Sequence, residues 1–223
     1  GGGNYDAPGQ LVGDFLDGRP STRLGSVEPS YKPGVHLTDL ASTLPDYAIE
    51  AIRDGRIVAM KGLGGFQLLV DATNAEAVAW LRQRKHRPDR PLAILAASLD
   101  MAAEYCEVSE QEALALASPE SPILLLKKRI LGGQPPIAAP VAPGNPYLGV
   151  MLPYTPLHHL LVTAVGRPMV CTSGNLSEEP MAIRTHDALR RLGSIADVVL
   201  THDRPIVRPV DDSVARLGPD GIQ

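Results

Sequence analysis

The distribution of hydrophobic residues changes at about residue 45. Residues 1–45 are rich in Gly, Pro, Asp and Ser and show no sustained hydrophobic period, a composition typical of irregular chain. From Pro45 onward, apolar residues recur at helical or strand spacing. We therefore expect an irregular Gly/Pro-rich arm over residues 1–45 and a folded domain over residues 46–223.

The second part of the chain alternates short apolar runs with longer mixed segments. Strands are predicted over residues 56–60, 66–70, 92–95, 123–126, 168–171, 198–200 and 213–216. Helices are predicted just before Gly55, over 75–85, twice across 99–117 and from Pro156 onward. A last helix is predicted after Thr185, running through Leu192. Several connections are too short for crossovers between parallel strands. The pattern therefore predicts an α/β (α+β) fold with a mixed sheet flanked by helices.

Local signals mark the ends of these helices. The candidate N-caps are residues 71–74, Ser98, Ser109 (in a capping box with Glu112), Thr155 and Thr185. Pro88 and Pro91 are expected to end the helix at 75–85. Five prolines within residues 132–146 predict an extended surface loop.

Composition narrows the class of protein. The 223 residues are 44% hydrophobic, with 21 Lys+Arg against 25 Asp+Glu, which argues against a wholly disordered chain or a general nucleic-acid coat. Neither an apolar run of about 18 residues nor a signal-peptide pattern is present, so we expect no membrane span. Cys106 and Cys171 are the only cysteines, too few for a disulfide framework or a four-cysteine zinc site. We expect a cytoplasmic protein.

The densest basic segment, residues 82–90, has two interpretations. It holds five fixed positive charges, and a solvated helix end accounts well for Arg82 and Arg84. Lys85, Arg87 and Arg90 lie at or beyond the helix end beside prolines that fix the backbone. Cations placed rigidly in this way suit a phosphate ligand.

Other polar segments leave their roles open. Lys61 opens a glycine turn in which a ligand can approach the backbone, but the turn matches no nucleotide-binding fingerprint. Thr172-Ser173-Gly174-Asn175 ends a strand, where sheets often bind ligands, yet a polar turn explains it equally. Of the adjacent His158 and His159, at most one can face a given site.

Metal ligation and thiol chemistry are weaker hypotheses. His202-Asp203 and Asp211-Asp212 are either magnesium ligands or structural caps, and the sequence fixes no third ligand. Cys171 lies in an apolar strand, which favours a core thiol over a nucleophile.

Six ordered segments form a recognisable series: Lys61–Phe66, Asp71–Asn74, Arg84–Pro91, Leu148–Leu161, Thr172–Ser177, and His202–Val207 with Asp211–Val214. This series resembles the YrdC-like domain of the hydrogenase-maturation carbamoyltransferase family, HypF, over about residues 46–217. The resemblance implies a twisted mixed sheet with a basic concave pocket.

The resemblance also implies an activity. The family's YrdC-like domain uses ATP, with Mg²⁺, and carbamoyl phosphate to form carbamoyl-adenylate, releasing pyrophosphate and phosphate. A Kae1-like domain then transfers the carbamoyl group to a cysteine of a hydrogenase-maturation acceptor protein. Broader relatives make threonylcarbamoyl-adenylate for tRNA modification. RNA binding without chemistry is a third possibility.

Residue roles follow from the family's K-x-R and S-x-N motifs. They match Lys85 and Arg87, which the resemblance makes the catalytic cations, and Ser173 and Asn175, which bind nucleotide or carbamoyl. The further binding residues on this basis are Lys61, Arg90, Thr172, Arg208 and Ser213, with Asp212 as a magnesium candidate.

The sequence departs from the family at several positions. Gln67 stands where relatives usually have His, Arg90-Pro91-Leu92 where Lys-Pro-Phe is common, and Pro209 interrupts the approach to Asp211. Residues 1–45 contain no cysteine, although the family has zinc modules ahead of this domain. We therefore expect no zinc, and the arm is interpreted as a degenerate remnant of that region or a linker.

Overall fold

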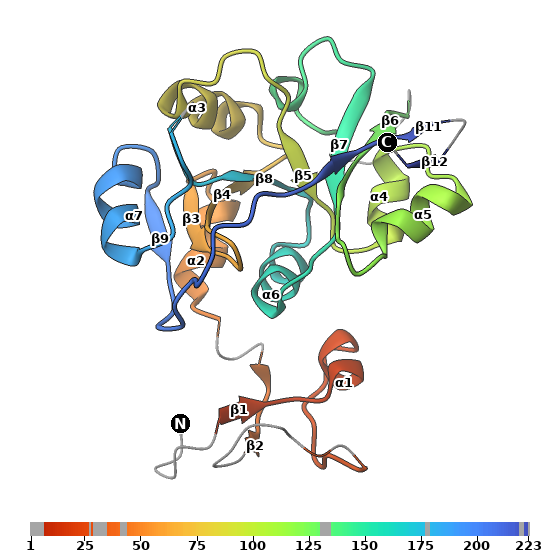
Figure 1. The fold of residues 1–223 in the computed structure, drawn as a ribbon, viewed down its shortest axis with the longest axis vertical. Coiled ribbons are helices and arrows are strands. Elements are labelled where there is room, and N and C mark those ends of the chain that lie inside the picture. Colours follow the sequence, from red (N-terminus) through yellow and green to blue (C-terminus); the bar gives the residue numbers. More distant parts are fainter. Residues whose placement is uncertain are drawn as a thin grey trace. The chain divides into compact units, whose positions relative to one another are not determined.

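A computed structural model describes residues 7–26, 28, 35–40, 44–129, 135–176, 179–218 and 221–222. The chain divides into two compact units, Gly1–Asp46 and Tyr47–Gln223. Each unit is described by itself (Figure 1).

The first unit contains short regular elements where the sequence analysis expected none. Strands β1 (Ala7–Gly9) and β2 (Val35–Leu37) pair in parallel, and helix α1 (Val12–Leu16) follows β1. Side-chain hydrogen bonds support these elements: the Ser21 hydroxyl donates to Asp14 at 2.7 Å and accepts from the Leu11 N–H at 2.9 Å. Because such bonds need no hydrophobic period, the pattern of apolar residues did not reveal the elements.

The second unit is built on an eight-stranded mixed sheet, in the order β10-β6-β7-β5-β8-β4-β3-β9. Its strands are β3 (Val58–Lys61), β4 (Phe66–Asp71), β5 (Ala93–Leu95), β6 (Ile123–Lys127), β7 (Tyr147–Met151), β8 (Met169–Ser173), β9 (Val198–Leu200) and β10 (Val214–Ala215). Neighbours β3–β4, β4–β8, β5–β8 and β6–β7 are antiparallel, whereas β3–β9, β5–β7 and β6–β10 are parallel. The predicted mixed sheet is confirmed. A two-stranded pair, β11 (Leu217–Gly218) and β12 (Gly221–Ile222), follows.

Six α-helices accompany this sheet in the described part of the unit: α2 (Asp46–Arg53), α3 (Ala75–Lys85), α4 (Leu99–Tyr105), α5 (Glu110–Leu116), α6 (Pro156–Val165) and α7 (Thr185–Leu192). Helix α3 packs on β4 and on a 3₁₀ helix, Ala139–Val141, and α5 packs on β6. In the described residues, no helix has the length and apolar character needed to cross a membrane.

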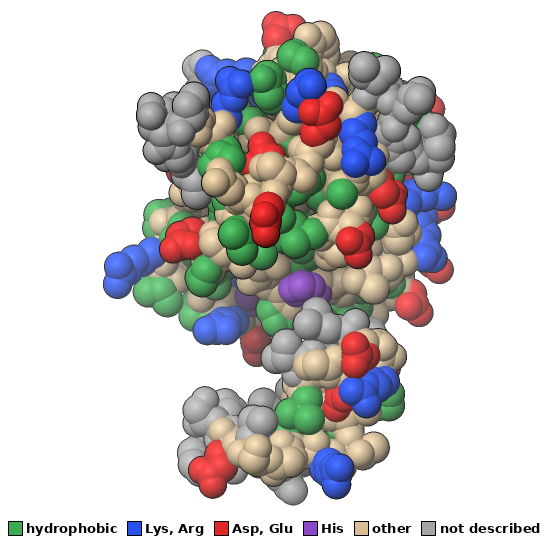
Figure 2. Space-filling view, turned by 90° about the vertical axis from the view of Figure 1, so that its right-hand side faces the viewer, with side chains coloured by type: hydrophobic (Ala, Val, Ile, Leu, Met, Phe, Trp, Pro, Cys, Tyr) green, Lys and Arg blue, Asp and Glu red, His purple; other side chains and the backbone are tan. Residues whose placement is uncertain are grey.

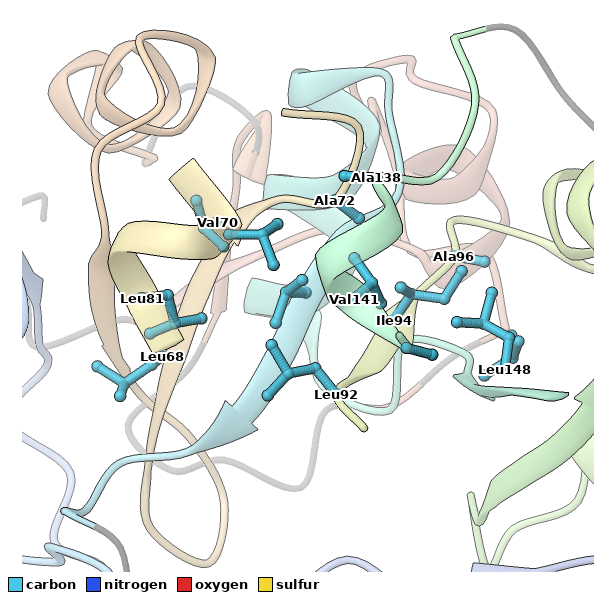
Figure 3. Packing of buried hydrophobic residues seen from close by; sticks show 14 of the residues in the cluster. Leu68, Val70, Ala72, Leu81, Leu92, Ile94, Ala96, Ala138, Val141 and Leu148 are labelled. Atoms are coloured by element: carbon cyan, nitrogen blue, oxygen red, sulfur yellow. The ribbon is translucent and has the colours of Figure 1, made fainter. Parts of the chain in front are cut away.

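The core lies where α3 meets the sheet. All six residues of β4 are buried, and Figure 3 shows Leu81 of α3 facing Leu68 and Val70 of that strand. Each fully buried Leu or Val contributes about 1.5–3 kcal/mol relative to an exposed side chain. This packing fixes the end of α3 against the sheet.

Several local predictions are confirmed. The helix over 75–85 has the predicted bounds, and its N-cap Asn74 accepts from the Ala77 N–H at 3.0 Å. Ser109 and Glu112 form the capping box in both directions. Thr155 caps α6 by accepting a hydrogen bond from the His158 N–H at 3.2 Å.

Helix α3 ends at Lys85 as predicted, and the next residue, His86, adopts the left-handed conformation (φ 55°, ψ 46°) before the prolines are reached. Two other predictions were wrong. Thr185 is the first residue of α7 rather than its cap, and its hydroxyl lies 3.3 Å from that of Thr201. The sequence analysis missed β7, whose Gly149 and proline-rich approach disguise a strand.

The segment expected as a surface loop is also partly core. Residues 130–134 lie outside the described part, but Val141 and Ala142 are buried. The Leu92 N–H donates to the Val141 carbonyl at 2.8 Å. The Ala138 N–H donates to the Ala72 carbonyl at 2.9 Å. Apolar residues between the prolines therefore cover the end of α3 and the start of β5.

Candidate functional site

A pocket of about 460 Å³ opens where β8 ends. We call it the central pocket; its lining residues are Arg87, Pro91, Leu92, Ala93, Ile123, Leu125, Asn145, Tyr147, Gly149, Cys171, Thr172, Ser173, Met181, Asp211, Asp212 and Val214. One part of this lining is apolar, and the rest presents a cation, hydroxyls and carboxylates. Such a mixture suits a ligand with one flat apolar part and one polar, anionic part.

Gly149 keeps space open in this pocket. A Cβ at this position would lie 3.1 Å from the Ile123 side chain and 3.3 Å from the Ala93 Cβ. Any larger side chain would have to occupy the pocket itself. The glycine that disguised β7 in the sequence therefore serves the site.

Lys85 lies behind the pocket rather than in it. Its side chain is only 1% exposed, and its Nζ donates to the Ser173 carbonyl at 2.6 Å, the Asn175 carbonyl at 2.7 Å and the Asn175 Oδ1 at 2.7 Å. Burial, with a smaller contribution from the nearby charge of Arg87, lowers the pKa of Lys85 to about 7. With its three donors engaged, Lys85 holds the Ser173–Asn175 turn in place.

The Asn175 side chain is likewise engaged within the turn. Its Oδ1 accepts from Lys85 and from the Ser173 hydroxyl, the latter at 2.7 Å, and its amide nitrogen donates to the Glu179 carbonyl. Since a lysine ammonium only donates, the orientation of the Asn175 amide is fixed. Ser173 faces the pocket with its proton directed away toward Asn175.

Arg87 is the cation that reaches the central pocket. Its Nη2 donates to the Pro91 carbonyl at 3.0 Å, while its buried Nε has no hydrogen-bond partner among the described residues. Burial, followed by the charges of Arg90 and Arg82, lowers the pKa of Arg87. A buried donor without a partner next to a pocket is a ready contact for an anionic oxygen.

Arg82 organises the loop that carries Arg87. Its guanidinium donates to the carbonyls of Arg87 (2.8 Å), Pro88 (3.0 Å), Arg90 (3.1 Å) and Val141 (3.2 Å), and also to that of Pro140. The residue is buried. Its interpretation as a solvated helix end was wrong, because the loop folds back over the helix and supplies the carbonyls that a buried guanidinium needs.

Arg84 has a different environment. It pairs with Asp197 at 2.6 Å and lies over the Trp80 ring, 5.2 Å from its centroid. Arg84, predicted as part of a solvated helix end, is instead half-buried and ion-paired, and it lines neither the central pocket nor the two pockets that adjoin it.

Two further pockets adjoin the central one. The flanking pocket, about 590 Å³, is lined by Lys61, His202, Arg204, Arg208 and the first residues of α6, among others. A smaller bridging pocket of about 250 Å³ shares Tyr154 with the flanking pocket and Asp211 and Asp212 with the central pocket. The three pockets therefore share walls.

The segment 201–213, here called the strap, forms one wall of all three pockets. It connects the edge strands β9 and β10 and crosses in front of the sheet (Figure 1). Lys61 Nζ donates to the His202 carbonyl at 2.9 Å, and the Val210 N–H donates to the Gly64 carbonyl at 3.1 Å.

The strap approaches the glycine turn at Gly64, whereas Lys61, Gly62 and Leu63 line the flanking pocket. A Cβ on Gly64 would meet the backbone oxygen of Val210 at 2.5 Å. This contact corrects our expectation that the turn leaves room for a ligand at that position.

A chain of hydrogen bonds runs from the core to the strap. Buried His158 Nε2 lies 2.7 Å from Gln67 Oε1, Gln67 Nε2 donates to the Tyr154 hydroxyl at 2.8 Å, and that hydroxyl donates to Asp212 Oδ1 at 3.1 Å. Burial lowers the pKa of His158 to about 4, so the ring is neutral. We call these four residues the polar chain.

The predicted site residues separate into groups. Arg87, Thr172, Ser173 and Asp212 line the central pocket, whereas Lys61 and Arg208 line the flanking pocket. Lys85 and Asn175 do not line the central pocket; their hydrogen bonds hold the turn that carries Ser173.

Two further predicted site residues, Ser213 and Arg90, line neither the central nor the flanking pocket. Ser213 lines the bridging pocket, and its carbonyl accepts from the Ile123 N–H at 2.8 Å. Arg90 is exposed and lines none of these three pockets. Cys171 is buried, and burial raises its thiol pKa, which agrees with a core thiol.

The hypothesis of a metal site gains no support from the described residues. Within the described ranges, no three His, Cys, Asp or Glu side chains gather as a metal site. His158 is wholly buried in the polar chain, and His159 is half-buried beside it.

Sequence reasoning missed Tyr147, Asn145 and Tyr154 as parts of these pockets. The Tyr147 ring lies 4.4 Å from the Arg216 guanidinium, and the Tyr147 hydroxyl accepts from Arg216 at 2.6 Å. Tyr154 and Tyr147 stand in or next to the motif at 148–161, which was the available signal.

Comparison with known proteins identifies the family. The family model Sua5_yciO_yrdC, described as "Telomere recombination", matches residues 50–223. The chain belongs to the Sua5/YciO/YrdC family.

Named relatives refine this placement within the Sua5/YciO/YrdC family. The chain is 51% identical over 172 residues to a carbamoyltransferase HypF of Synechocystis sp., covering 77% of this chain and 22% of that protein. It is 46% identical over 195 residues to a carbamoyltransferase HypF of Rhodobacter capsulatus, covering 86% of this chain and 26% of that protein.

A solved structure agrees. The crystal structure of full-length HypF in a phosphate- and nucleotide-bound form is 44% identical with a TM-score of 0.73, covering 77% of this chain and 26% of that one. The chain thus spans about a quarter of the length of these larger proteins.

Proposed function

We propose that residues 47–223 activate a carbamoyl group by adenylation, as the first half of a carbamoyl transfer in hydrogenase maturation. Hydrolysis of carbamoyl phosphate supplies carbamate and inorganic phosphate. A carbamate oxygen then attacks the α-phosphorus of ATP, the bond from that phosphorus to the bridging oxygen breaks, and pyrophosphate leaves. A Kae1-like transferase domain and an acceptor protein would use the resulting carbamoyl-adenylate.

The observation that carries this proposal is the unpartnered Arg87 Nε beside a pocket with an apolar part and a polar part. Pro91, Leu125 and Tyr147 offer a surface of the kind that adenine needs. Arg87 and the Thr172 hydroxyl line the polar part of the same pocket and would bind the phosphate oxygens of the nucleotide. The solved relative is named for a phosphate- and nucleotide-bound form, which agrees with nucleotide binding by proteins of this kind.

The chemistry asks mainly for positioning and charge neutralisation. The nucleophile is weak and the triphosphate is strongly anionic, so fixed cations and oriented donors lower the barrier. Arg87 is rigid because Arg82 holds its loop, and the flanking pocket adds Lys61, Arg204 and Arg208 for the departing pyrophosphate. Mg²⁺ enters as the ATP complex and needs no cage of protein ligands.

Two other functions receive less support. Threonylcarbamoyl-adenylate synthesis requires the same pocket, but the relatives at 51% and 46% identity are carbamoyltransferases. RNA binding by a basic surface is disfavoured on the face shown in Figure 2, where Asp and Glu side chains are interspersed with Lys and Arg.

The deciding experiment is pyrophosphate release from ATP and Mg²⁺, with carbamoyl phosphate or with threonine plus bicarbonate as the acyl source. Carbamoyl phosphate should support release and threonine should not. Arg87→Ala should lower the rate by about a hundredfold, the scale of losing one transition-state donor. Arg84→Ala is the matched control, because Arg84 is a neighbouring partly buried arginine paired with Asp197, and it should retain the rate. If only threonine plus bicarbonate supports pyrophosphate release, the proposal is wrong and the domain makes threonylcarbamoyl-adenylate.

A further inference from the structure

The central pocket contains acceptors that an anionic ligand does not need. Asp211 and Asp212 line it together with Arg87 and Thr172, and a carboxylate repels phosphate oxygens at close range. Asp212 therefore suits a part of the ligand that donates hydrogen bonds.

The polar chain gives the direction of the hydrogen bond that Asp212 accepts from Tyr154. Tyr154 donates its only proton to Asp212 Oδ1, so its oxygen accepts from the Gln67 amide nitrogen. The Gln67 Oε1 then accepts from His158, which must carry its proton on Nε2. All donors point toward Asp212, so the chain orients this carboxylate as an acceptor. Burial, the larger effect, raises the pKa of Asp212, and the hydrogen bonds from Tyr154 and Gln67 act against this rise.

Ser173 is a second acceptor of the same kind. Its hydroxyl proton is committed to Asn175 Oδ1, which Lys85 holds in place, so the remaining lone pairs of Ser173 face the pocket. Strand register places Ser173 directly opposite Gln67, the residue that leads to Asp212. The same end of the pocket thus presents a hydroxyl acceptor and a carboxylate acceptor.

We propose that Asp212, assisted by Ser173, binds the amino group of the carbamoyl substrate and selects it over acyl groups that lack N–H donors. A carbamoyl NH₂ carries two N–H donors and no positive charge, which matches two acceptors from the pocket wall. Tyr154, Gln67 and His158 are positioning residues that hold Asp212. This inference rests on the proposed acyl-adenylate site and assigns the part of it that distinguishes substrates.

A matched pair of ligands tests the assignment. The 5′-O-(N-carbamoylsulfamoyl) and 5′-O-(N-acetylsulfamoyl) adenosines are stable acyl-adenylate analogues that differ only in NH₂ against CH₃. The full chain should bind the carbamoyl analogue at least about tenfold more tightly by calorimetry, as expected for a hydrogen bond to a charged group. Ser173→Ala should reduce this ratio.

Asp212→Asn should bring the ratio close to one by weakening the carbamoyl analogue alone, because the variant amide places a donor where an acceptor is needed. Tyr154→Phe should reduce the ratio in part, since it removes only the group that orients Asp212. Tyr105→Phe is its control, because this buried tyrosine donates to the Pro135 carbonyl at 3.3 Å and lines none of the three pockets. Asp211→Asn changes the same charge one residue away and should affect both analogues alike.

Each result has a definite meaning. If wild-type protein binds both analogues equally, or if Asp212→Asn weakens both to the same extent, the inference is overturned while the acyl-adenylate site stands. If wild-type protein binds neither analogue, the proposed function and the inference fall together. Thermal unfolding of each variant shows whether a lost ratio reflects a lost fold.

Discussion

At the residue scale, burial sets the protonation of Lys85. The pKa of its ammonium falls to about 7 from the ordinary 10.5, so the folded chain binds fewer protons than the unfolded chain between these values. The contribution of Lys85 to stability therefore decreases as pH falls from 10.5 to about 7 and is constant below that.

Nucleotide binding should reverse this shift. Phosphate groups near Arg87 add negative charge close to Lys85 and raise the pKa of its ammonium. We predict proton uptake when nucleotide binds at pH 8, measured by calorimetry in two buffers of different ionisation enthalpy. Below about pH 6, where Lys85 is already charged, its uptake should vanish.

Lysine variants separate this effect from others. Lys85→Met should abolish the uptake at pH 8, whereas Lys127→Met, which removes an exposed lysine paired with Glu107, should leave it intact. Equal uptake by Lys85→Met and wild type would assign the proton to another group.

At the scale of elements, the loop after α3 depends on one guanidinium. Arg82 donates to three carbonyls of residues 87–90 and to two of the 3₁₀ helix. Arg82→Lys keeps the charge but loses the planar fork, leaving several buried carbonyls without donors. We predict a loss of about 2–4 kcal/mol in the free energy of unfolding, measured with urea. Arg84→Lys, the control outside this loop, should lose much less; equal losses would contradict a special role for Arg82.

The strap depends on a glycine. In Gly64→Ala the new methyl group would meet the Val210 backbone, which cannot move as a flexible side chain would. We predict that the strap is displaced, so thermolysin, which cleaves before large apolar residues, cuts before Ile206 and Val207 several-fold faster than in wild type, and pyrophosphate release declines. Gly13→Ala, where a Cβ meets nothing within 4 Å, should change neither result. An unchanged cleavage rate in Gly64→Ala would show that the strap tolerates the methyl group.

These elements show what the sequence could and could not reveal. Helix α3 and the capping box at Ser109 were predictable because their signals lie within a few residues. The burial of Arg82 was not predictable, because the carbonyls that accept its hydrogen bonds reach it only when the loop at 87–90 folds back over the helix. The polar chain joins residues 58 to 91 positions apart, and no local pattern encodes such contacts. The motif series found the right segments, and packing decided which side chains face the pocket.

At the scale of the whole molecule, every residue lining the three pockets belongs to the second compact unit. The fold of that unit includes α2, whose Ala48, Ala51 and Ile52 are fully buried. The unit therefore holds both the proposed site and the core beneath it. Helix α2 starts at Asp46, so a fragment that begins at Leu44 keeps this helix complete.

We predict that the fragment 44–223 unfolds in one cooperative transition and binds nucleotide with the affinity of the full chain. A second fragment, 56–223, lacks α2 and should be less stable by about 3 kcal/mol or more, since removing one buried Ile alone costs about that much. Urea unfolding and calorimetric titration measure the two properties independently. If 44–223 folds but binds nucleotide more weakly than the full chain, residues before 44 contribute to the site. If it does not fold, the division between the units is not a folding boundary.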